Sequence, residues 1–264
     1  PQAIKRGSKI IVTEKKSKDF KNGILFIKTK NIRKLLAEVS FKIYNKIPKN
    51  LVAVTGTNGK SSVAEFYFQI MKLNKKKVAS IGTLGVKSKK INFKLFNTTI
   101  DPIKLGKTLQ KLKKEKIENV IMEASSHGLK QNRLDGLNFK SGIFTNLSQD
   151  HLDYHKNLTK YLKAKLYLFE NLIEKKGNII TDKDIPQYTT IKKISLKKKL
   201  KLSAINEKQN NFEILSQRYN NENQLVKIKH KNLIKEINLN LIGKIQIKNI
   251  FMAAIAAQKS NLNL

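Results

Sequence analysis

A glycine-rich loop between an apolar strand and a helix constrains the fold of this chain more than any other feature. Residues 51–54 form a short apolar run, the sequence Gly-Thr-Asn-Gly-Lys-Ser-Ser follows at residues 56–62, and a helical pattern continues to Leu73. This order of strand, loop and helix directs backbone N–H groups and the positive end of a helix dipole at one point. The sequence therefore predicts a loop that binds the phosphates of ATP.

The individual residues of this loop suit that role. Gly56 and Gly59 let the backbone approach a phosphate closely, Lys60 would reach the β- and γ-phosphates, and the Ser61 hydroxyl would hold magnesium. The usual spacing has a further glycine where this chain has Val54, so the loop is a compact variant. A glycine-rich turn that binds nothing is the alternative, which the complete strand, loop and helix disfavour. The predicted ATP-binding residues of the loop are Gly56, Thr57, Asn58, Gly59, Lys60, Ser61 and Ser62.

Strands and helices alternate along most of the chain, which predicts an α/β fold with a mostly parallel sheet flanked by helices. The expected strands cover residues 9–13, 24–29, 51–54, 77–81, 119–123 and 142–145, and the expected helices cover residues 31–44, 62–73, 101–116, 159–172 and 246–259. Asn31 is the expected N-cap of the first helix, with Leu35, Leu36, Val39 and Ile43 on one face. Asp101 followed by Pro102 marks another helix start.

Two stretches depart from this alternation. Residues 45–50, which include Pro48, are typical of a linker between two units. Residues 191–241 are polar and lysine-rich, and apolar and polar residues alternate at 211–215 and 224–229. We expect a small antiparallel β region there.

The net charge of +35 raises the possibility of a nucleic-acid-binding protein. However, arginine, which base readout and bidentate phosphate contacts favour, occurs only at positions 6, 33, 133 and 218. Lysine is spread along the whole chain together with abundant asparagine and isoleucine, as in proteins from A+T-rich genomes. The preferred interpretation is a solvated lysine-rich surface without specific nucleic-acid binding, which attracts polyanions only weakly.

The composition excludes several other classes of protein. There is no cysteine, so disulfides, thiolate zinc sites and cysteine nucleophiles are ruled out. No apolar run approaches the ~20 residues that span a bilayer, and the first residues lack the pattern of a signal peptide. We expect a soluble, cytoplasmic monomer without a membrane partner. The start at Pro1 rather than methionine suggests an internal fragment of a longer protein.

Polar side chains follow two of the expected strands. Glu123 ends one strand and precedes Ala-Ser-Ser-His-Gly, and the carboxyl ends of parallel strands are where ligands bind. Glu123 is therefore placed to bind the metal that bridges the ATP phosphates. The segment 145–155 follows the next strand and contains His151, Asp153 and His155. Three of the four histidines lie in these two clusters, which favours a functional site over scattered structural histidines.

Two further segments carry no comparable physical signal. Asn97, Thr98 and Thr99 form a polar loop whose hydroxyls could simply cap the next helix. Lys165 is one of many lysines on an amphipathic helix, and a solvated helix lysine is the ordinary interpretation. Neither segment would be selected from the physics of the sequence alone.

Taken together, the segments 55–62, 97–99, 123–129, 131–133 and 145–155 resemble the Mur ligase family, specifically its MurE branch. The resemblance covers nearly the whole chain. It implies that residues 1–44 are the end of an N-terminal UDP-binding domain, with the remainder of that small α/β domain missing. It implies that residues 45–264 are the central ATP-binding domain and that the C-terminal domain is absent. A fragment of this kind would be almost inactive.

The resemblance also implies an activity. Members of this branch are ATP-dependent amide ligases that add meso-diaminopimelate or L-lysine to UDP-N-acetylmuramoyl-L-alanyl-D-glutamate in peptidoglycan synthesis. The reaction proceeds through an acyl phosphate, so negative charge accumulates and would be stabilised by Lys60 and two magnesium ions.

The resemblance assigns roles to particular residues. Ser61 and Glu123 would hold one magnesium ion, His151 would bind the second, and Lys165 would be carboxylated by CO₂ to provide an oxygen ligand for that ion. Asn146 and Asn249 would lie near the adenine. The residues implied to bind the UDP-muramoyl dipeptide are Asn97, Thr98, Thr99, Ser125, Gln131 and Arg133.

Three alternatives stay open at this point. One is another Mur-type or folylpolyglutamate-type ligase, against which the Asn-Thr-Thr segment at 97–99 and the segment 125–129 argue. The others are a basic nucleic-acid-binding protein and a P-loop nucleotidase that drives conformational change instead of ligation.

Overall fold

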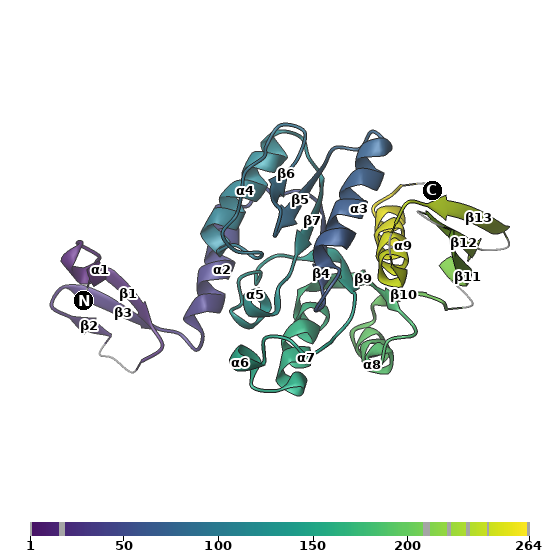
Figure 1. The fold of residues 1–264 in the computed structure, drawn as a ribbon. Helices are drawn as coiled ribbons and strands as arrows, with labels where there is room; N and C mark the ends of the chain where they lie inside the picture. Colours follow the sequence, from purple (N-terminus) through teal and green to yellow (C-terminus); the bar gives the residue numbers. More distant parts are fainter. Residues whose placement is uncertain are drawn as a thin grey trace.

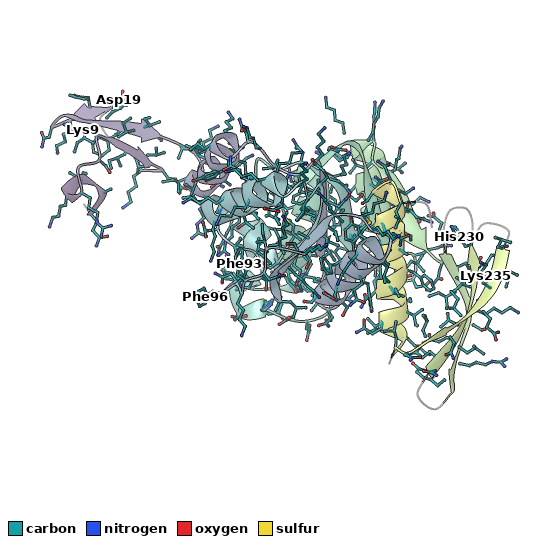
Figure 2. The ribbon with its side chains drawn as sticks, turned by 90° about the horizontal axis from the view of Figure 1, so that it is seen from above. Lys9, Asp19, Phe93, Phe96, His230 and Lys235 are labelled. Carbon is teal, nitrogen blue, oxygen red and sulfur yellow. The ribbon has the colours of Figure 1, made fainter. Side chains whose placement is uncertain are left out.

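The computed structural model describes residues 2–15, 19–207, 212–220, 223–230, 233–241 and 243–262. A large central sheet has helices on both faces, and a small three-stranded sheet lies toward each end of the molecule (Figure 1). In the perpendicular view, Lys9 and Asp19 mark one of these ends and His230 and Lys235 the other (Figure 2). The predicted α/β class with a mostly parallel sheet is confirmed.

Strand β4 (Asn50–Thr55) lies in the middle of the central sheet, whose order is β10-β9-β8-β4-β7-β5-β6. The other strands are β5 (Val78–Gly82), β6 (Gly85–Lys87), β7 (Asn119–Glu123), β8 (Phe139–Phe144), β9 (Ile173–Asp182) and β10 (Lys201–Ile205). All neighbouring pairs are parallel except β5 and β6. The carboxyl ends of β4, β5, β7 and β8 therefore meet at one edge, where open α/β sheets bind ligands.

The side chains of β4 alternate between two hydrophobic cores. Leu51 and Ala53 pack into the core on one face of the sheet, and Val52 and Val54 pack into the core on the other. Every residue of β4 is buried, as expected for a central parallel strand with helices on both sides. The helices are α3 (Lys60–Leu73), α4 (Pro102–Lys114), α5 (Ser126–Lys130), α6 (Leu152–His155), α7 (Leu158–Tyr167), α8 (Tyr188–Lys198) and α9 (Lys244–Lys259).

The predicted start of α4 is confirmed in detail. The Asp101 carboxylate accepts a hydrogen bond from the backbone N–H of Lys104, and Pro102 occupies the first turn of α4. Helix α7 is followed by one π-helical turn (Leu168–Leu172), so the predicted helix over 159–172 has two parts. The side chain of Asn157, the N-cap of α7, accepts from the N–H of Lys160.

The N-terminal arm consists of α1 (Gln2–Lys5), β1 (Ile10–Thr13), β2 (Phe20–Lys21), β3 (Ile24–Lys28) and α2 (Ile32–Ile43). Asn31 caps α2 as predicted, by accepting from the N–H of Lys34. The apolar residues expected on one face of α2 are not the residues that the structure buries. Leu36, Val39 and Ile43 are exposed, whereas Ala37, Ser40 and Phe41 are buried. Gly136 lies close to α2, since a Cβ on it would be 3.0 Å from Cα of Glu38.

The region after residue 190 is also more complex than predicted. Helix α8 and strand β10, which pairs in parallel with β9, continue the α/β pattern to Ile205. The predicted antiparallel region is confirmed further on, where β11 (Phe212–Asn220), β12 (Asn223–His230) and β13 (Leu233–Leu239) form a sheet. Asn211, the first residue of one predicted strand, lies outside the described residues. Among the helices that the structure describes, none is long and apolar enough to cross a membrane.

Candidate active site

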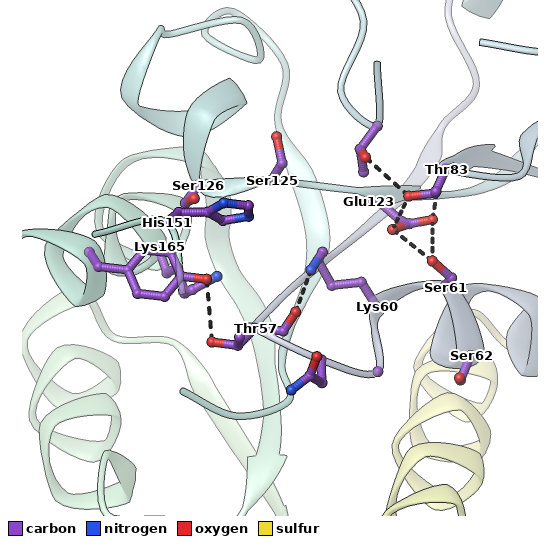
Figure 3. Close-up of a pocket in the computed structure, with 14 residues that line it drawn as sticks. Thr57, Lys60, Ser61, Ser62, Thr83, Glu123, Ser125, Ser126, His151 and Lys165 are labelled. Carbon is purple, nitrogen blue, oxygen red and sulfur yellow. Dashed lines mark hydrogen bonds between the residues drawn. The ribbon is translucent and has the colours of Figure 1, made fainter. Parts of the chain in front are cut away.

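A cavity of about 350 Å³ opens at the edge of the central sheet where β4, β5 and β7 end (Figure 3). The phosphate loop forms one wall, and segments that follow strands β5, β7 and β8 form the others. The cavity is lined by Thr57, Asn58, Gly59, Lys60, Ser61, Ser62, Thr83, Thr98, Glu123, Ser125, Ser126, His151, Tyr161 and Lys165. Most of the residues singled out in the sequence therefore meet in one place.

The two glycines of the phosphate loop occupy positions where a side chain does not fit. Gly56 has φ +153°, and a Cβ there would lie 1.8 Å from Oγ1 of Thr145. Gly59 has φ +85° and starts α3, and a Cβ there would lie 2.7 Å from Oδ1 of Asn249. A residue outside the loop also fixes its conformation. The side-chain oxygen of Asn146 accepts a hydrogen bond from the backbone N–H of Asn58 at 3.0 Å.

The side chain of Lys60 folds back over the first residues of the phosphate loop. Its ammonium group donates to the backbone carbonyl oxygens of Gly56 (3.0 Å) and Thr57 (2.8 Å). Burial lowers the pKa of Lys60, and the charge of Glu123 partly opposes this shift. The cation is thus fixed beside the helix N-terminus, where both would attract an anion.

Glu123 is almost fully buried at the end of β7, with 3% of its surface exposed. The Ser61 hydroxyl lies 3.0 and 3.1 Å from its two carboxylate oxygens. Thr83 adds a backbone N–H (2.8 Å) and a hydroxyl (3.1 Å) from the end of β5 (Figure 3). A buried carboxylate with adjacent hydroxyls is the oxygen-rich environment that magnesium prefers.

Sequence reasoning missed Thr83. It follows β5 directly, so the rule that ligand-binding residues follow parallel strands could have selected it. Its hydroxyl also lies 3.0 Å from that of Thr98, which connects Glu123 to the Asn-Thr-Thr segment.

Lys165 is the most completely buried charged side chain of the cavity, with 1% of its surface exposed. Its amine donates to the carbonyl oxygen of Gly56 at 2.6 Å and lies 4.2 Å from the centre of the Tyr161 ring. Burial, together with the nearby charge of Lys60, lowers the pKa of Lys165 to about 7. A substantial fraction of this amine is therefore neutral, and nucleophilic, near neutral pH.

The three clustered histidines come together with Tyr154 and Tyr161. The rings of His127 and His151 are 4.9 Å apart, and those of His127 and His155 are 5.5 Å apart. His151 lines the cavity and has the left-handed conformation (φ +51°), which is uncommon for a residue other than glycine.

Of the three histidines, His155 is fully buried, and its Nε2 lies 3.0 Å from the Ser126 hydroxyl. Burial lowers the pKa of His155 to about 4, so the ring is neutral at physiological pH. Across the described residues, no three His, Asp or Glu side chains converge as a metal-binding group.

In Figure 3, Ser61 and Glu123 lie on one side of the cavity, His151 and Lys165 lie on the other, and the Lys60 amine lies between them. This arrangement places oxygen ligands, a fixed cation and a reactive amine around one space. The fixed cation in the middle suits a ligand that carries negative charge.

Only some of the residues that the resemblance implies for binding the muramoyl substrate line the cavity. Thr98 and Ser125 line the cavity, whereas Asn97, Gln131 and Arg133 do not. Thr99 is buried, and its hydroxyl bonds to the Glu123 carbonyl oxygen (2.9 Å) and to Ser125. Arg133 donates to the backbone carbonyl of Thr99 and to the side chain of Gln131, so Arg133 connects Gln131 to the Asn-Thr-Thr segment.

Asn146 and Asn249 adjoin the phosphate loop without lining the cavity itself. Asn249 is 1% exposed on α9, and its Oδ1 atom has no hydrogen-bond partner within the described part of the chain. A buried polar atom without a partner is costly. Because this atom points at Gly59, a ligand donor bound beside the loop could satisfy it.

The chain is similar to known proteins in sequence and in fold. Residues 54–257 match the family described as the Mur ligase middle domain. The chain is 38% identical over 253 residues to the UDP-N-acetylmuramoyl-L-alanyl-D-glutamate--2,6-diaminopimelate ligase of Zymomonas mobilis, covering 96% of this chain and 52% of the relative. The chain therefore spans about half the length of that relative.

Solved structures show the same fold. A structure of a UDP-N-acetylmuramoyl-L-alanyl-D-glutamate--2,6-diaminopimelate ligase superimposes with a TM-score of 0.84 at 22% identity, over 99% of this chain and 53% of the other. An FPGS–AMPPCP complex superimposes with a TM-score of 0.68 at 12% identity, over 88% of this chain and 64% of the other.

Proposed function

Since the chain belongs to the Mur ligase family, we propose that it is the nucleotide-binding part of an ATP-dependent ligase that extends UDP-N-acetylmuramoyl-L-alanyl-D-glutamate with 2,6-diaminopimelate. We propose that residues 1–44 are the end of an N-terminal UDP-binding domain and residues 45–264 the central ATP-binding domain. We further propose a cytoplasmic, monomeric enzyme of peptidoglycan synthesis. The family is ATP-dependent, and the diamino acid is the one named for the Zymomonas mobilis relative.

One observation carries this proposal: Ser61 and Glu123 face Lys165 and His151 across a cavity that also contains Lys60. The reaction would bring a substrate carboxylate to the γ-phosphate of ATP, and both groups are negative. Lys60 is held where it can stabilise that charge, and the rigid loop fixes the position of the phosphates. The site therefore supports transfer of a phosphoryl group to a carboxylate.

The donor set fits magnesium. Ser61 and Glu123 would hold one ion, and His151 with a carboxylated Lys165 would hold a second. Magnesium bound there would neutralise part of the charge on the phosphates of ATP. Carboxylation needs a neutral amine, and the buried position of Lys165 with its lowered pKa favours that form.

Two further groups of residues are proposed to contact the adenine and the muramoyl dipeptide. Asn146 and Asn249 lie against the phosphate loop and would contact the adenine, with Oδ1 of Asn249 accepting from its amino group. Thr98 and Ser125 would contact the muramoyl dipeptide directly. Asn97, Thr99, Gln131 and Arg133 are proposed for the same substrate, and the hydrogen bonds of the last three indicate that they also shape the loop.

The test is release of phosphate by the whole protein that contains this chain. Release should require ATP, magnesium, the UDP-muramoyl dipeptide and diaminopimelate together. Glu123→Gln keeps the size of the side chain and removes its charge, so it should raise the magnesium concentration needed for half-maximal activity. Turnover with a folate and glutamate instead would refute the proposal in favour of a folylpolyglutamate-type ligase. ATP hydrolysis without the muramoyl substrate would favour a nucleotidase.

A further inference from the structure

A second cavity, of about 460 Å³, lies where the N-terminal arm meets helices α5 and α7. It uses a different side of α7 from the first cavity: Tyr161 and Lys165 line the first, and Lys160 and Lys163 line the second. The size is within the range of small-molecule sites in proteins. None of the roles discussed above uses this cavity.

The rim of the second cavity is basic. It carries Lys34 from α2, Lys130 from α5, and Lys160 and Lys163 from α7, and no acidic residue is among its lining residues. Lysine and arginine are 54 of the 264 residues, about one in five, whereas four of the nine lining residues here are lysines. The enrichment therefore exceeds the high background of this chain.

These lysines are poorly neutralised by the protein itself. Lys34 lies 3.9 Å from both Glu38 and Asp135, which is long for an ion pair. Within the described residues, no carboxylate forms an ion pair with the other three lysines. Like charges that converge on a concave surface repel each other and focus positive potential into it. A bound anion would relieve this repulsion.

The floor of the cavity is apolar and firmly held. Tyr167 contributes its ring, while its hydroxyl donates to Asp135 (2.6 Å) and accepts from the amide of Asn132 (3.1 Å). Asn132 in turn accepts from the amide of Asn31 at 2.9 Å. These polar groups are already satisfied by one another. The Lys130 amine lies 3.5 Å from the carbonyl oxygen of Tyr154 and 4.5 Å from the centre of its ring, so a ligand would be bound first by the amines of Lys34, Lys160 and Lys163.

We propose that this lysine cavity (Lys34, Lys130, Lys160 and Lys163 above Tyr167) binds a small organic phosphate with at least two negative charges. Ammonium groups bind phosphate as point charges, and the absence of arginine argues against a site built for bidentate carboxylate recognition. The apolar floor would accommodate the carbon skeleton. Because Lys34 belongs to the N-terminal arm and the other lysines to α5 and α7, the ligand would also fasten the arm to the central domain. This proposal does not depend on the ligase activity.

Position-resolved lysine acylation, read by mass spectrometry, tests the proposal, because it reports separately on the lysines that line each cavity. Pyrophosphate or uridine diphosphate, at about 0.15 M salt to screen nonspecific attraction, should reduce acylation of the four cavity lysines several-fold. Lys192 and Lys193, exposed on α8, should not change. Equal protection by both probes would mean that the phosphates alone are recognised, whereas stronger protection by uridine diphosphate would place the nucleoside on the apolar floor.

A pair of variants provides the matched control. Lys160→Gln with Lys163→Gln should abolish the ligand-induced protection of Lys34 and Lys130. Lys192→Gln with Lys193→Gln removes the same charge elsewhere and should leave that protection intact. Protection by neither probe, or equal loss of protection in both double variants, would overturn the proposal.

Discussion

The amine of Lys165 lies 2.6 Å from the backbone carbonyl oxygen of Gly56, which joins helix α7 to the phosphate loop inside the cavity. This contact buries a cation beside another cation, Lys60, and both effects favour the neutral amine. The buried position of the Lys165 side chain therefore fixes its location and also favours its neutral, nucleophilic form.

The stability contributed by Lys165 should depend on pH. Its pKa is about 7 in the folded protein and about 10.5 when unfolded, so between these values the unfolded chain binds more protons. Stability attributable to Lys165 should rise with pH across that window and be constant below it. Guanidinium unfolding of the wild type and Lys165→Met, in CO₂-free buffers from pH 6 to about 10, would measure the difference. A difference independent of pH would contradict this expectation.

His155 should stay neutral to unusually low pH. Its ring is fully buried, and burial lowers its pKa to about 4 from the ordinary 6.5. NMR signals of this imidazole should therefore stay constant between pH 7 and pH 5 and titrate near pH 4. Between pH 6.5 and pH 4 the unfolded state binds the extra proton, so acidification should destabilise the fold. Titration near 6.5 would show that the ring is accessible to water.

Gly59→Ala should impair both stability and nucleotide binding. Positive φ alone costs about 1–2 kcal/mol for a residue with a Cβ, and here the new methyl group would also displace Asn249. Gly243→Ala is the matched control: Gly243 has φ +93°, with nothing in the described structure within 4 Å of the new atom. Chemical denaturation should show a loss in both variants, and calorimetric ATP titration a loss only in Gly59→Ala. Equal ATP affinity in the two would argue against the contact with Asn249.

Tyr167→Phe should destabilise the junction between the arm and the central domain. The substitution removes two hydrogen bonds and leaves the carboxylate of Asp135, which is 3% exposed, with one donor fewer. Loss of such partners typically costs about 1–3 kcal/mol. Tyr219, which is 57% exposed on β11, provides the comparison, and Tyr219→Phe should change the free energy of unfolding little. Similar values for both variants would show that the hydrogen bonds of Tyr167 add no net stability.

The sequence predicts those parts of the fold that depend on local signals. Asp101 and Pro102 define the start of α4, and the apolar run of β4 identifies the central strand. The apolar periodicity of α2 does not identify its buried face, since Leu36, Val39 and Ile43 are exposed. The structure instead buries Ala37, Ser40 and Phe41. That preference arises from tertiary contacts, which local periodicity does not encode.

The residues of the site also differ in whether the sequence alone identifies them. Glu123 and the loop glycines are marked by their place after a strand, so the rules for parallel sheets identify them. Thr83 follows the same rule but stands alone, without a neighbouring cluster to draw attention to it. Lys165 is indistinguishable in composition from the other lysines of the chain, and only its burial against Gly56 sets it apart. Burial of a single side chain is a property of the assembled structure.

The central place of β4 also determines when the site can form during folding. Asn50 pairs with Asn119 of β7, and Val52 pairs with Ser141 of β8, so β4 acquires its neighbours only after long loops have closed. Such distant pairings carry a large loop-closure entropy and slow the search for the native state. Glu123, the phosphate loop and Lys165 come together only once those pairings exist. ATP should therefore bind no partly paired intermediate, and should slow unfolding without accelerating the early steps of folding.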